Sequence, residues 1–315
     1  MAGYLHGVKV LLLVNPFSSS VTARGRVVIR KALSADHDVT LVETSRRGHA
    51  TRLALGAANE GVDVVAVLGG DGTLNEAANG LAGTDTALGA LPGGSTNVFA
   101  RTIGLPNDPI EATGVLLDAM EQNNIKPVGL GSVNGRYFLF HVGMGWDAAV
   151  VQQVEKRAAL KRYAGHPLFA WCAITTWTRH FDHKRPRFAV HVPGQRVVDD
   201  GVFSLVLNTN PYTFLGNRPF DVSPKAGLDQ PLLSLTVRSM TLFRLLAVSL
   251  AALRGGDRVK KVRGVEMRPA VESLTVTGYG PFPYQVDGDY LGDTSELRFR
   301  WEAGALRLVL PPGAV

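Results

Sequence analysis

Apolar runs alternate with amphipathic stretches through the first 130 residues of the chain. Val8–Val14 is a continuous apolar run, as expected of a strand that is covered on both faces of its sheet. Stretches whose apolar residues recur three or four positions apart follow these runs and predict helices. The expected strands are Val8–Val14, Asp38–Glu43, Val62–Leu68 and Ala87–Leu91, and the expected helices are Arg24–Leu33, Gly48–Asn59, Thr73–Leu81, Asn97–Ile103 and Asp108–Glu121. This order is typical of a doubly wound, mostly parallel sheet.

The pattern changes after about Lys126 to short strand-like runs separated by turn residues. These runs are Tyr137–Val142, Arg187–His191, Ser204–Asn208, Leu232–Val237, Ser273–Thr277 and Leu297–Arg300. Two helical stretches interrupt them, at Trp146–His180 and Leu242–Arg254. We therefore predict an α/β plus β chain, with an N-terminal doubly wound α/β domain at 1–130 and a C-terminal antiparallel β-rich domain at 131–301. The last strand, Leu306–Leu310, could complete either domain.

Composition narrows the class of protein. Hydrophobic residues make up 45% of the chain, which excludes general disorder. The single cysteine, Cys172, excludes an internal disulfide framework and a multi-cysteine zinc site. The longest apolar run, Leu242–Leu253, is shorter than the roughly 20 residues of a membrane span, so we expect it to pack against protein and the chain to be soluble or peripherally bound. The net charge of +6 favours anionic partners: nucleotide phosphates, nucleic acid or an anionic membrane.

The sharpest motif is the run LGGDGTLN at 68–75, between a predicted strand and a predicted helix. Its glycines allow a tight turn and close approach of a phosphate to backbone amides, which the helix N-terminus would supplement. Thr73 adds a hydroxyl. A carboxylate at Asp71, where the ligand is itself anionic, suits Mg²⁺ held on nucleotide phosphates. The alternative is a plain glycine turn in which Asp71 caps the helix.

Two more loops follow predicted strands. The run LPGGSTNVFAR at 91–101 offers two glycines and the donors Ser95, Thr96 and Asn97, although the same residues suit a capped helix start. The run VNPFSSS at 14–20 places Asn15 after the first strand. Loops at the carboxyl ends of parallel strands converge on one crevice, where such sheets bind ligands. Neither GxxxxGK[ST] nor GxGxxG occurs, which disfavours P-loop and dinucleotide-fold readings.

Together these runs resemble the catalytic domain of diacylglycerol kinases, a family that includes sphingosine kinases and bacterial soluble lipid kinases. GGDGTLNE at 69–76, LPGGSTNVFAR at 91–101 and VNP at 14–16 carry the resemblance. GMGWD at 143–147 and VDGD at 286–289 resemble the glycine-aspartate and Asp-Gly-Glu elements of the family, in family order. GGDGT alone is shared with NAD kinases, so an NAD kinase-like activity is the alternative within enzymes.

The resemblance implies a two-domain fold with the nucleotide in the cleft between domains, and a C-terminal tail (302–315) that returns to the nucleotide-binding first domain, leaving 131–301 for the lipid. It implies transfer of the γ-phosphate of Mg²⁺-ATP to a lipid hydroxyl, with diacylglycerol giving phosphatidic acid for phospholipid biosynthesis. The implied ATP-binding residues are Asn15, Thr44, Gly70, Asp71, Gly72, Thr73, Ser95 and Thr96. Asp71 would contact the metal, Asp289 would act as general base, and Asp147 would help arrange the site.

Several positions depart from the family pattern. Asp289 stands where a glutamate is usual and is one methylene shorter. Val98 replaces an aspartate often found after the second glycine loop, and Gln230 replaces the second aspartate of a stretch that holds a structural Mg²⁺ in bacterial relatives. These departures keep a second class open, a nucleotide-binding regulator that has lost catalysis.

The partners follow from the implied substrate. Residues 151–190 carry eight lysines and arginines interleaved with aromatic residues, a pattern that suits an anionic membrane surface or a solvated basic face. We expect a cytoplasmic protein, peripheral at the inner face of a membrane, that takes its lipid substrate there and binds no nucleic acid. A homodimer remains an open alternative. The histidines, including His141, show no metal-binding spacing and are interpreted as structural.

Overall fold

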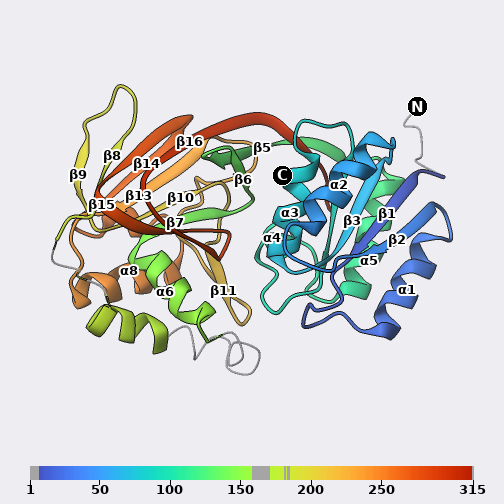
Figure 1. Cartoon of the computed structure of the whole chain (residues 1–315), viewed down its shortest axis with the longest axis horizontal. Helices are drawn as coiled ribbons and strands as arrows, with labels where there is room; N and C mark the ends of the chain where they lie inside the picture. The colour runs from blue at the N-terminus through green and yellow to red at the C-terminus, as the bar shows by residue number, and fades with distance from the viewer. Residues whose placement is uncertain (1–6, 158–170, 181, 183–184, 314–315) are drawn as a thin grey trace. The chain divides into compact units, whose positions relative to one another are not determined.

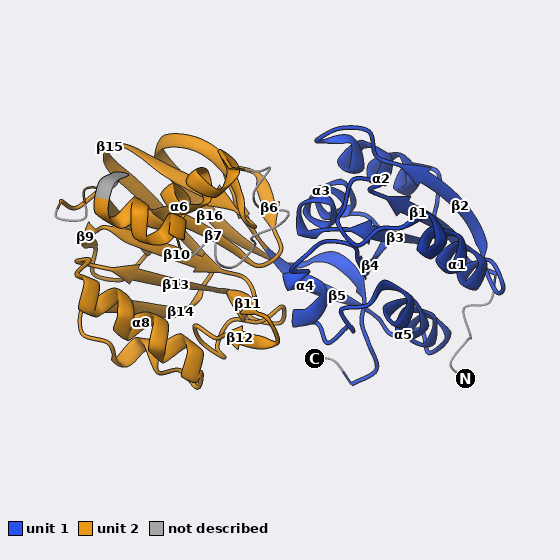
Figure 2. Cartoon of the chain, turned by 90° about the horizontal axis from the view of Figure 1, so that it is seen from below, with its two compact units in different colours: residues 1–130, 303–315 blue, residues 131–302 orange. Residues whose placement is uncertain are grey.

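The computed structural model describes residues 7–157, 171–180, 182 and 185–313. It divides into two compact units, shown in different colours in Figure 2. Unit 1 comprises residues 1–130 and 303–315, and unit 2 comprises residues 131–302. Each unit is built around its own hydrophobic core, so each is described by itself.

Unit 1 is built on parallel strands. Strand β1 (Lys9–Val14) lies between β2 (Asp38–Glu43) and β3 (Val64–Gly69), and β4 (Ala87–Pro92) follows β3. The far edge of β4 pairs with the end of β16 (Asp289–Val309), again in parallel, so the C-terminal stretch of the chain completes this sheet. The four N-terminal strands begin and end within two residues of the predicted ranges. The apolar runs of β1, β3 and β4 are buried almost throughout, whereas β2 alternates between exposed and half-buried residues.

Helices cover both faces of this sheet. Figure 2 shows α2 (His49–Asn59) and α3 (Asp71–Leu81) on one face, and α1 (Ala23–Leu33) and α5 (Pro109–Glu121) on the other. The short α4 (Val98–Thr102) follows β4. Asp108 caps α5 by accepting hydrogen bonds from the amides of Ile110 and Glu111. The doubly wound α/β class is therefore confirmed for this part of the chain.

Unit 2 is an antiparallel β structure. Its strands run in the order β14-β13-β10-β7-β15-β16, with β8 pairing β15, β9 pairing β8, and β5 pairing both β16 and β6. Pairing is antiparallel for β10 with β7 and β13, for β13 with β14, and for β15 with β7, β8 and β16. Strand β5 (Ile125–Val133) begins in unit 1 and ends in unit 2. The strands that lie wholly in unit 2 are β6 (Arg136–Phe138), β7 (His141–Gly145), β8 (Phe188–His191), β9 (Val198–Gly201), β10 (Phe203–Leu207), β11 (Thr213–Leu215), β12 (Arg218–Phe220), β13 (Leu232–Val237), β14 (Val265–Val271) and β15 (Ser273–Val286). This confirms the predicted β-rich class.

The two longest strands differ from the prediction. Sequence periodicity predicted short strands at Ser273–Thr277 and Leu297–Arg300, whereas β15 and β16 run much further. The register of their pairing shifts between Thr277 and Phe282, where the sequence reads Gly-Tyr-Gly-Pro. Glycine and proline weaken the strand signal in a sequence, so the irregular region concealed the continuity.

Helices of unit 2 lie on one face of its sheet (Figure 1). They are α6 (Trp146–Glu155), the helical residues 171–180 and α8 (Leu242–Arg254), followed by the short helical turn η2 (Val259–Lys261). Trp146, Trp177 and Leu245, one from each of the three helices, pack against a common apolar cluster built on β10 and β13. The helical stretch predicted at Trp146–His180 is helical at Trp146–Glu155 and at 171–180, and residues 158–170 lie outside the described residues. None of the helices in the described parts is long and apolar enough to cross a bilayer.

Close packing of α2 against α3 yields a stability prediction. A Cβ at Gly80 would lie 2.4 Å from the Thr51 carbonyl oxygen, whereas a Cβ at the exposed helical Gly114 would meet nothing within 4 Å. We expect Gly80→Ala to lower the free energy of unfolding by roughly 1–3 kcal/mol through overpacking. Gly114→Ala, the matched control, should raise it by up to about 1 kcal/mol through helix propensity. Urea unfolding measures both, and equal effects of the two substitutions would contradict this packing.

Candidate active site

The glycine loop after β3 leads directly into α3. Gly69 is the last residue of β3, and Gly70 precedes α3 in an extended conformation with no side-chain cap on the helix. The helix therefore begins at Asp71, two residues before the predicted start. An uncapped helix N-terminus presents backbone N–H groups and the positive end of the helix dipole, which favours a phosphate. The predicted residues Gly70, Asp71, Gly72 and Thr73 form this first turn.

Asp71 links this loop to the next one. Its carboxylate oxygens accept hydrogen bonds from the amides of Val98 (2.9 Å) and Phe99 (3.0 Å), the first residues of α4. Asp71 therefore caps a helix, but the helix is α4 and not the one that it begins. At least two of the roughly four acceptor positions of this carboxylate are therefore taken by backbone amides. The predicted contact of Asp71 with Mg²⁺ on nucleotide phosphates stays a prediction.

The second glycine loop is closed by Asn97. This residue has a left-handed backbone (φ 50°), and its side chain accepts from the Gly94 amide (2.7 Å) while donating to the Gly94 carbonyl (2.9 Å) and to Asn107 (2.8 Å). These hydrogen bonds of Asn97 close the turn, and Ser95 lies exposed and Thr96 half-buried at its tip. The two hydroxyl groups predicted to contact ATP are therefore presented by a rigid turn.

Backbone contacts hold the loops together. The Gly93 amide donates to the Gly69 carbonyl (2.8 Å), and Ser20 of the first loop donates its amide to Gly93 (2.9 Å) and its hydroxyl to Gly94 (3.0 Å). A Cβ at Gly93 would lie 2.9 Å from the Gly69 nitrogen. The glycines are thus required for contact between loops, a reason that the sequence alone did not reveal.

The remaining predicted ATP-binding residues lie at the same edge of the sheet. Asn15 donates to the Thr73 hydroxyl (2.9 Å) and accepts from the Phe17 amide (3.0 Å). Thr44, just past β2, is buried and donates its amide to Val14 (2.8 Å), beside Asn15. The ends of four adjacent parallel strands thus bring together the eight residues that the resemblance assigned to ATP.

Sequence reasoning overlooked three features of this edge. Arg101 lies near Asp71. Burial lowers the pKa of the Arg101 guanidinium, and the Asp71 carboxylate opposes that shift. Since arginine keeps its charge in proteins, a cation lies beside the glycine loops. Glu76 accepts hydrogen bonds from the amides of Gly48 (2.7 Å) and Ala50 (3.2 Å), which explains a glutamate at the end of GGDGTLNE. A hollow of about 270 Å³ also adjoins the loops, and its lining includes Ser20 and Asn107.

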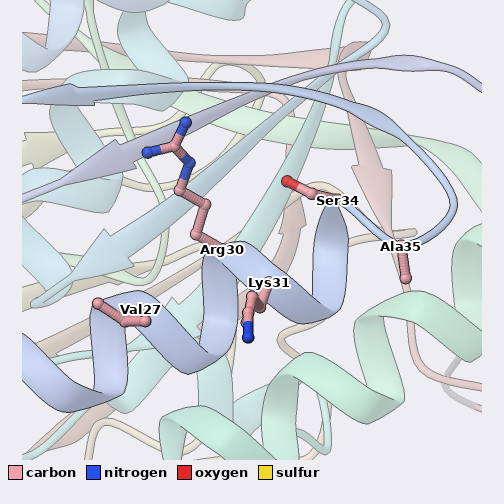
Figure 3. A pocket seen from close by; sticks show the side chains of 5 residues that line it. All are labelled: Val27, Arg30, Lys31, Ser34 and Ala35. Atoms are coloured by element: carbon pink, nitrogen blue, oxygen red, sulfur yellow. The ribbon is translucent and has the colours of Figure 1, made fainter.

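A larger hollow of unit 1 lies elsewhere. Its volume is about 480 Å³, and Figure 3 shows its lining: Val27, Arg30, Lys31, Ser34 and Ala35. These residues belong to the C-terminal half of α1 and its cap, which lie at the amino-terminal edge of the parallel strands. The glycine loops are at the opposite edge, so this hollow is not part of the candidate site.

A second group of functional candidates lies in unit 2, around Asp147. This carboxylate is buried and accepts hydrogen bonds from the Tyr212 hydroxyl (2.5 Å) and the Gln285 amide group (2.8 Å). Burial raises the pKa of Asp147, while these two hydrogen bonds act in the opposite direction. A Cβ at Gly143 would lie 1.7 Å from the Asp147 carboxylate, which explains why GMGWD requires a glycine four residues before the aspartate.

Gln285 connects Asp147 to the predicted base. Its side-chain oxygen accepts from the Gly288 amide (2.8 Å), the residue that immediately precedes Asp289. Hydrogen bonds therefore connect Asp147, through Gln285, to the turn that precedes Asp289. This connection is a physical basis for the predicted role of Asp147 in arranging the site. Asp289 itself is half-buried at the start of β16.

The turn at Asp287-Gly288 is a tight hairpin between β15 and β16. Both residues have positive φ (49° and 82°), as a type I′ turn requires, and Val286 pairs directly with Asp289. The buried Asp287 carboxylate accepts from the amides of Leu139 (2.7 Å), Phe140 (3.0 Å) and His141 (3.0 Å). Asp287 thus fastens the hairpin to the segment before β7.

The described residues also limit where a metal could bind. Within 7–157, 171–180, 182 and 185–313, no three His, Cys, Asp or Glu side chains form a group that could hold a metal ion. A Mg²⁺ near Asp71 would thus take most of its ligands from phosphate oxygens and water, which is how this ion is usually bound at nucleotide sites. Asp229 and Gln230 are exposed in a turn of unit 2.

The chain is similar in sequence to proteins named as diacylglycerol or lipid kinases. Residues 9–133 match the family model described as diacylglycerol kinase catalytic domain. The diacylglycerol kinase of Bacillus subtilis is 38% identical over 120 residues, which cover 38% of this chain and 39% of that protein. The "Probable lipid kinase YegS-like" of Chromohalobacter salexigens is 32% identical over 217 residues, 67% of this chain and 65% of that protein. The chain thus aligns with between about two fifths and two thirds of these relatives' lengths.

Solved structures share the fold. A structure described as a "putative diacylglycerol kinase" from Bacillus anthracis has a TM-score of 0.77 at 24% identity and covers 100% of this chain and 99% of that one. An NAD kinase from Archaeoglobus fulgidus in complex with ATP has a TM-score of 0.51 at 10% identity, with 96% and 94% coverage. The fold is therefore that of the lipid kinases and NAD kinases. The resemblance to the diacylglycerol kinase catalytic domain family is confirmed, and it is carried by residues 9–133.

The buried histidine of unit 2 yields a prediction on pH. Burial lowers the pKa of His141 to about 3, and its ring stacks against Tyr212 at 4.2 Å. The neutral ring is kept when the protein is folded, whereas the unfolded chain takes up a proton below about pH 6.5. Stability is therefore present above pH 6.5 and is lost as the pH falls from there toward 3.

We expect His141→Phe to reduce this loss, because phenylalanine keeps an aromatic ring at the stacking position and does not titrate. Between pH 8 and pH 5, the unfolding free energy of the wild type should fall by about 2 kcal/mol more than that of the variant. Chemical unfolding at both pH values measures the difference. A His141→Phe profile identical to the wild type would disprove the assignment.

Proposed function

We propose that the chain is an ATP-dependent lipid kinase that transfers the γ-phosphate of Mg²⁺-ATP to a lipid hydroxyl, with diacylglycerol as the acceptor and phosphatidic acid as the product. The observation that carries the proposal is the convergence of three glycine- and hydroxyl-rich loops at the uncapped N-terminus of α3, inside the segment that matches the kinase family. That geometry suits the phosphates of a nucleotide.

Residues of unit 1 would bind and orient the nucleotide. The α3 amides and the hydroxyls of Thr73, Ser95 and Thr96 would donate to phosphate oxygens, and Asn15 would keep Thr73 oriented. Arg101 would add positive charge near Asp71. When bound, Mg²⁺ supplies charge neutralisation of the phosphates. Phosphoryl transfer depends mainly on such positioning and electrostatic stabilisation.

Asp289 would accept the proton of the attacking hydroxyl. An alcohol loses its proton late in phosphoryl transfer, so a carboxylate of ordinary basicity suffices. The Asp287-Gly288 turn and Gln285 would hold Asp289 in place. Its side chain is one methylene shorter than the glutamate of the family pattern, so the acceptor would approach this hairpin more closely.

The first test is transfer of labelled γ-phosphate from Mg²⁺-ATP to a panel of lipids in mixed micelles, with NAD as a parallel acceptor. We expect label on diacylglycerol. Label on NAD alone would replace the proposed function with an NAD kinase activity, which the shared fold allows. Binding of ATP without label on any acceptor would contradict catalysis and favour a nucleotide-binding regulator.

Asp289→Asn tests the proton acceptor. The amide keeps the size of the side chain but not its basicity, so we expect kcat to fall about 100-fold or more. ATP affinity, measured by calorimetry, should remain within about twofold, since a group that acts only on the acceptor hydroxyl contributes little to nucleotide binding. Asp293→Asn is the control, because it makes the same change at an exposed residue of the same strand. Full activity of Asp289→Asn would show that another group takes the proton.

Gln285→Met tests the proposed positioning role of Gln285. Methionine fills a similar volume but can neither donate to Asp147 nor accept from Gly288. We expect kcat for the lipid to fall by roughly 10- to 100-fold through misplacement of Asp289, with KM for ATP unchanged. Gln285→Glu keeps an acceptor for Gly288 but sets a second carboxylate against the buried Asp147, so we expect it to recover none of the loss. An unchanged kcat for Gln285→Met would exclude the positioning role.

A further inference from the structure

Helix α8 of unit 2 has two apolar faces. The inner face packs Leu245, Val248 and Ala252 against the cluster built on β10 and β13. This packing agrees with the expectation that the helix lies against protein. The opposite face, however, is also apolar, and in the described structure it is open to solvent.

The outer face is formed by large side chains. Phe243 is 85% exposed, Leu246 is 57% exposed, and Leu242 and Leu250 are about half-exposed. These positions are one, three and four residues apart, which places them along one stripe of the helix. Soluble monomers seldom expose such a contiguous apolar patch unless it binds something. Thirteen residues are too few to span a bilayer, so a membrane-bound α8 would lie in the plane of the interface.

Positive charge surrounds this stripe. Residues 238–263 contain seven lysines and arginines and a single acidic residue, Asp257, giving a formal charge of +6 that equals the charge of the whole chain. Asp257 is already paired with Lys260. The basic side chains that flank α8 on its C-terminal side are exposed, and they are Arg254, Arg258, Lys260, Lys261 and Arg263. No acidic residue lies on α8 itself.

We propose that the outer face of α8 and the basic segment after it form a docking surface for an anionic lipid bilayer. The four apolar side chains would enter the acyl boundary while the lysines and arginines contact headgroup phosphates, the arrangement of an interfacial amphipathic helix. Charge complementarity selects this occupant. A second copy of the chain would bring the same concentrated positive charge against this face, which opposes self-association.

The helical residues 171–180 contribute to the same side of the unit. Trp177 packs against the same apolar cluster as α8, whereas Trp171 is 50% exposed and Ile174 is 65% exposed. Arg157 lies 4.9 Å from the centre of the Trp171 ring. Exposed tryptophan with neighbouring arginine is suited to the headgroup region. The membrane contact predicted from residues 151–190 stays a prediction, and residues 158–170, 181, 183 and 184 lie outside the described residues.

The test is co-sedimentation of the full chain with vesicles of phosphatidylcholine, with and without phosphatidylglycerol. We expect the wild type to bind the anionic vesicles. The double variant Phe243→Glu and Leu246→Glu should bind them about tenfold more weakly or worse, because two apolar side chains that would enter the bilayer are replaced by negative charges. The matched control is Val27→Glu with Leu55→Glu, two exposed apolar residues on helices of unit 1. Equal binding by both double variants would overturn the proposal.

The charge is tested separately. Arg258→Ser with Lys261→Ser should weaken binding to anionic vesicles by about tenfold, since each basic residue near the surface contributes modestly. Arg24→Ser with Lys31→Ser removes the same two charges from exposed positions of unit 1 and should leave binding unchanged. Sedimentation equilibrium checks the other occupant: a wild-type dimer that the α8 variant converts to a monomer would assign the face to a second copy and overturn the proposal.

The proposal concerns a partner of the proposed lipid kinase, but the two can fail independently. Vesicle binding needs no catalysis, so it stands even if no lipid is phosphorylated. Conversely, phosphorylation of a short-chain, water-soluble diacylglycerol needs no membrane, so the α8 variants should retain that activity. Kinase activity on the soluble acceptor without binding of the wild type to anionic vesicles would refute the docking surface alone.

Discussion

The close approach of Gly93 to Gly69 is the constraint on which the candidate nucleotide site depends. Only residues without a side chain let the loop after β4 lie on the loop after β3, and the Gly93–Gly69 hydrogen bond then fixes their spacing. Asp71 can reach the start of α4 because of this contact, and Asn97 can close its turn beside it. A sheet edge that would otherwise carry independent loops thereby becomes one preorganised surface, which is what binding of phosphates requires.

Unit 2 uses buried carboxylates for a similar purpose. Asp287 satisfies three backbone amides, and Asp147 receives two side-chain donors, so neither negative charge is left unpaired. A buried polar network is rigid only when all its members are satisfied. The half-buried Asp289 comes directly after Gly288, whose amide is bound by this network, so the network fixes the position of Asp289. The two units thus achieve order by different means, glycine contacts in one and satisfied buried acids in the other.

The sequence predicted the parallel half of the fold nearly to the residue, because buried strands and amphipathic helices have strong periodic signals. The sequence also predicted that the ATP-binding candidates lie at one edge of the sheet, since alternating strands and helices form parallel strands whose carboxyl ends share an edge. It could not reveal that Asp71 caps α4, that Glu76 caps α2 or that Gln285 connects Asp147 to Gly288. These contacts join residues up to 138 positions apart, and no local pattern encodes them. The continuous β15 was missed because Gly278, Gly280 and Pro281 interrupt its alternation.

The pairing of β4 with the end of β16 has a consequence for biosynthesis. The partners of Ala87 and Leu88 are Arg307 and Leu308, which leave the ribosome some 220 residues later. Until then, the β4 edge of the first unit has an open row of backbone donors and acceptors, the feature that promotes association between chains. The second unit, whose residues lie between these partners, can become compact before the first sheet is complete. During synthesis, the β4 edge of unit 1 is thus exposed until the final strand has been made.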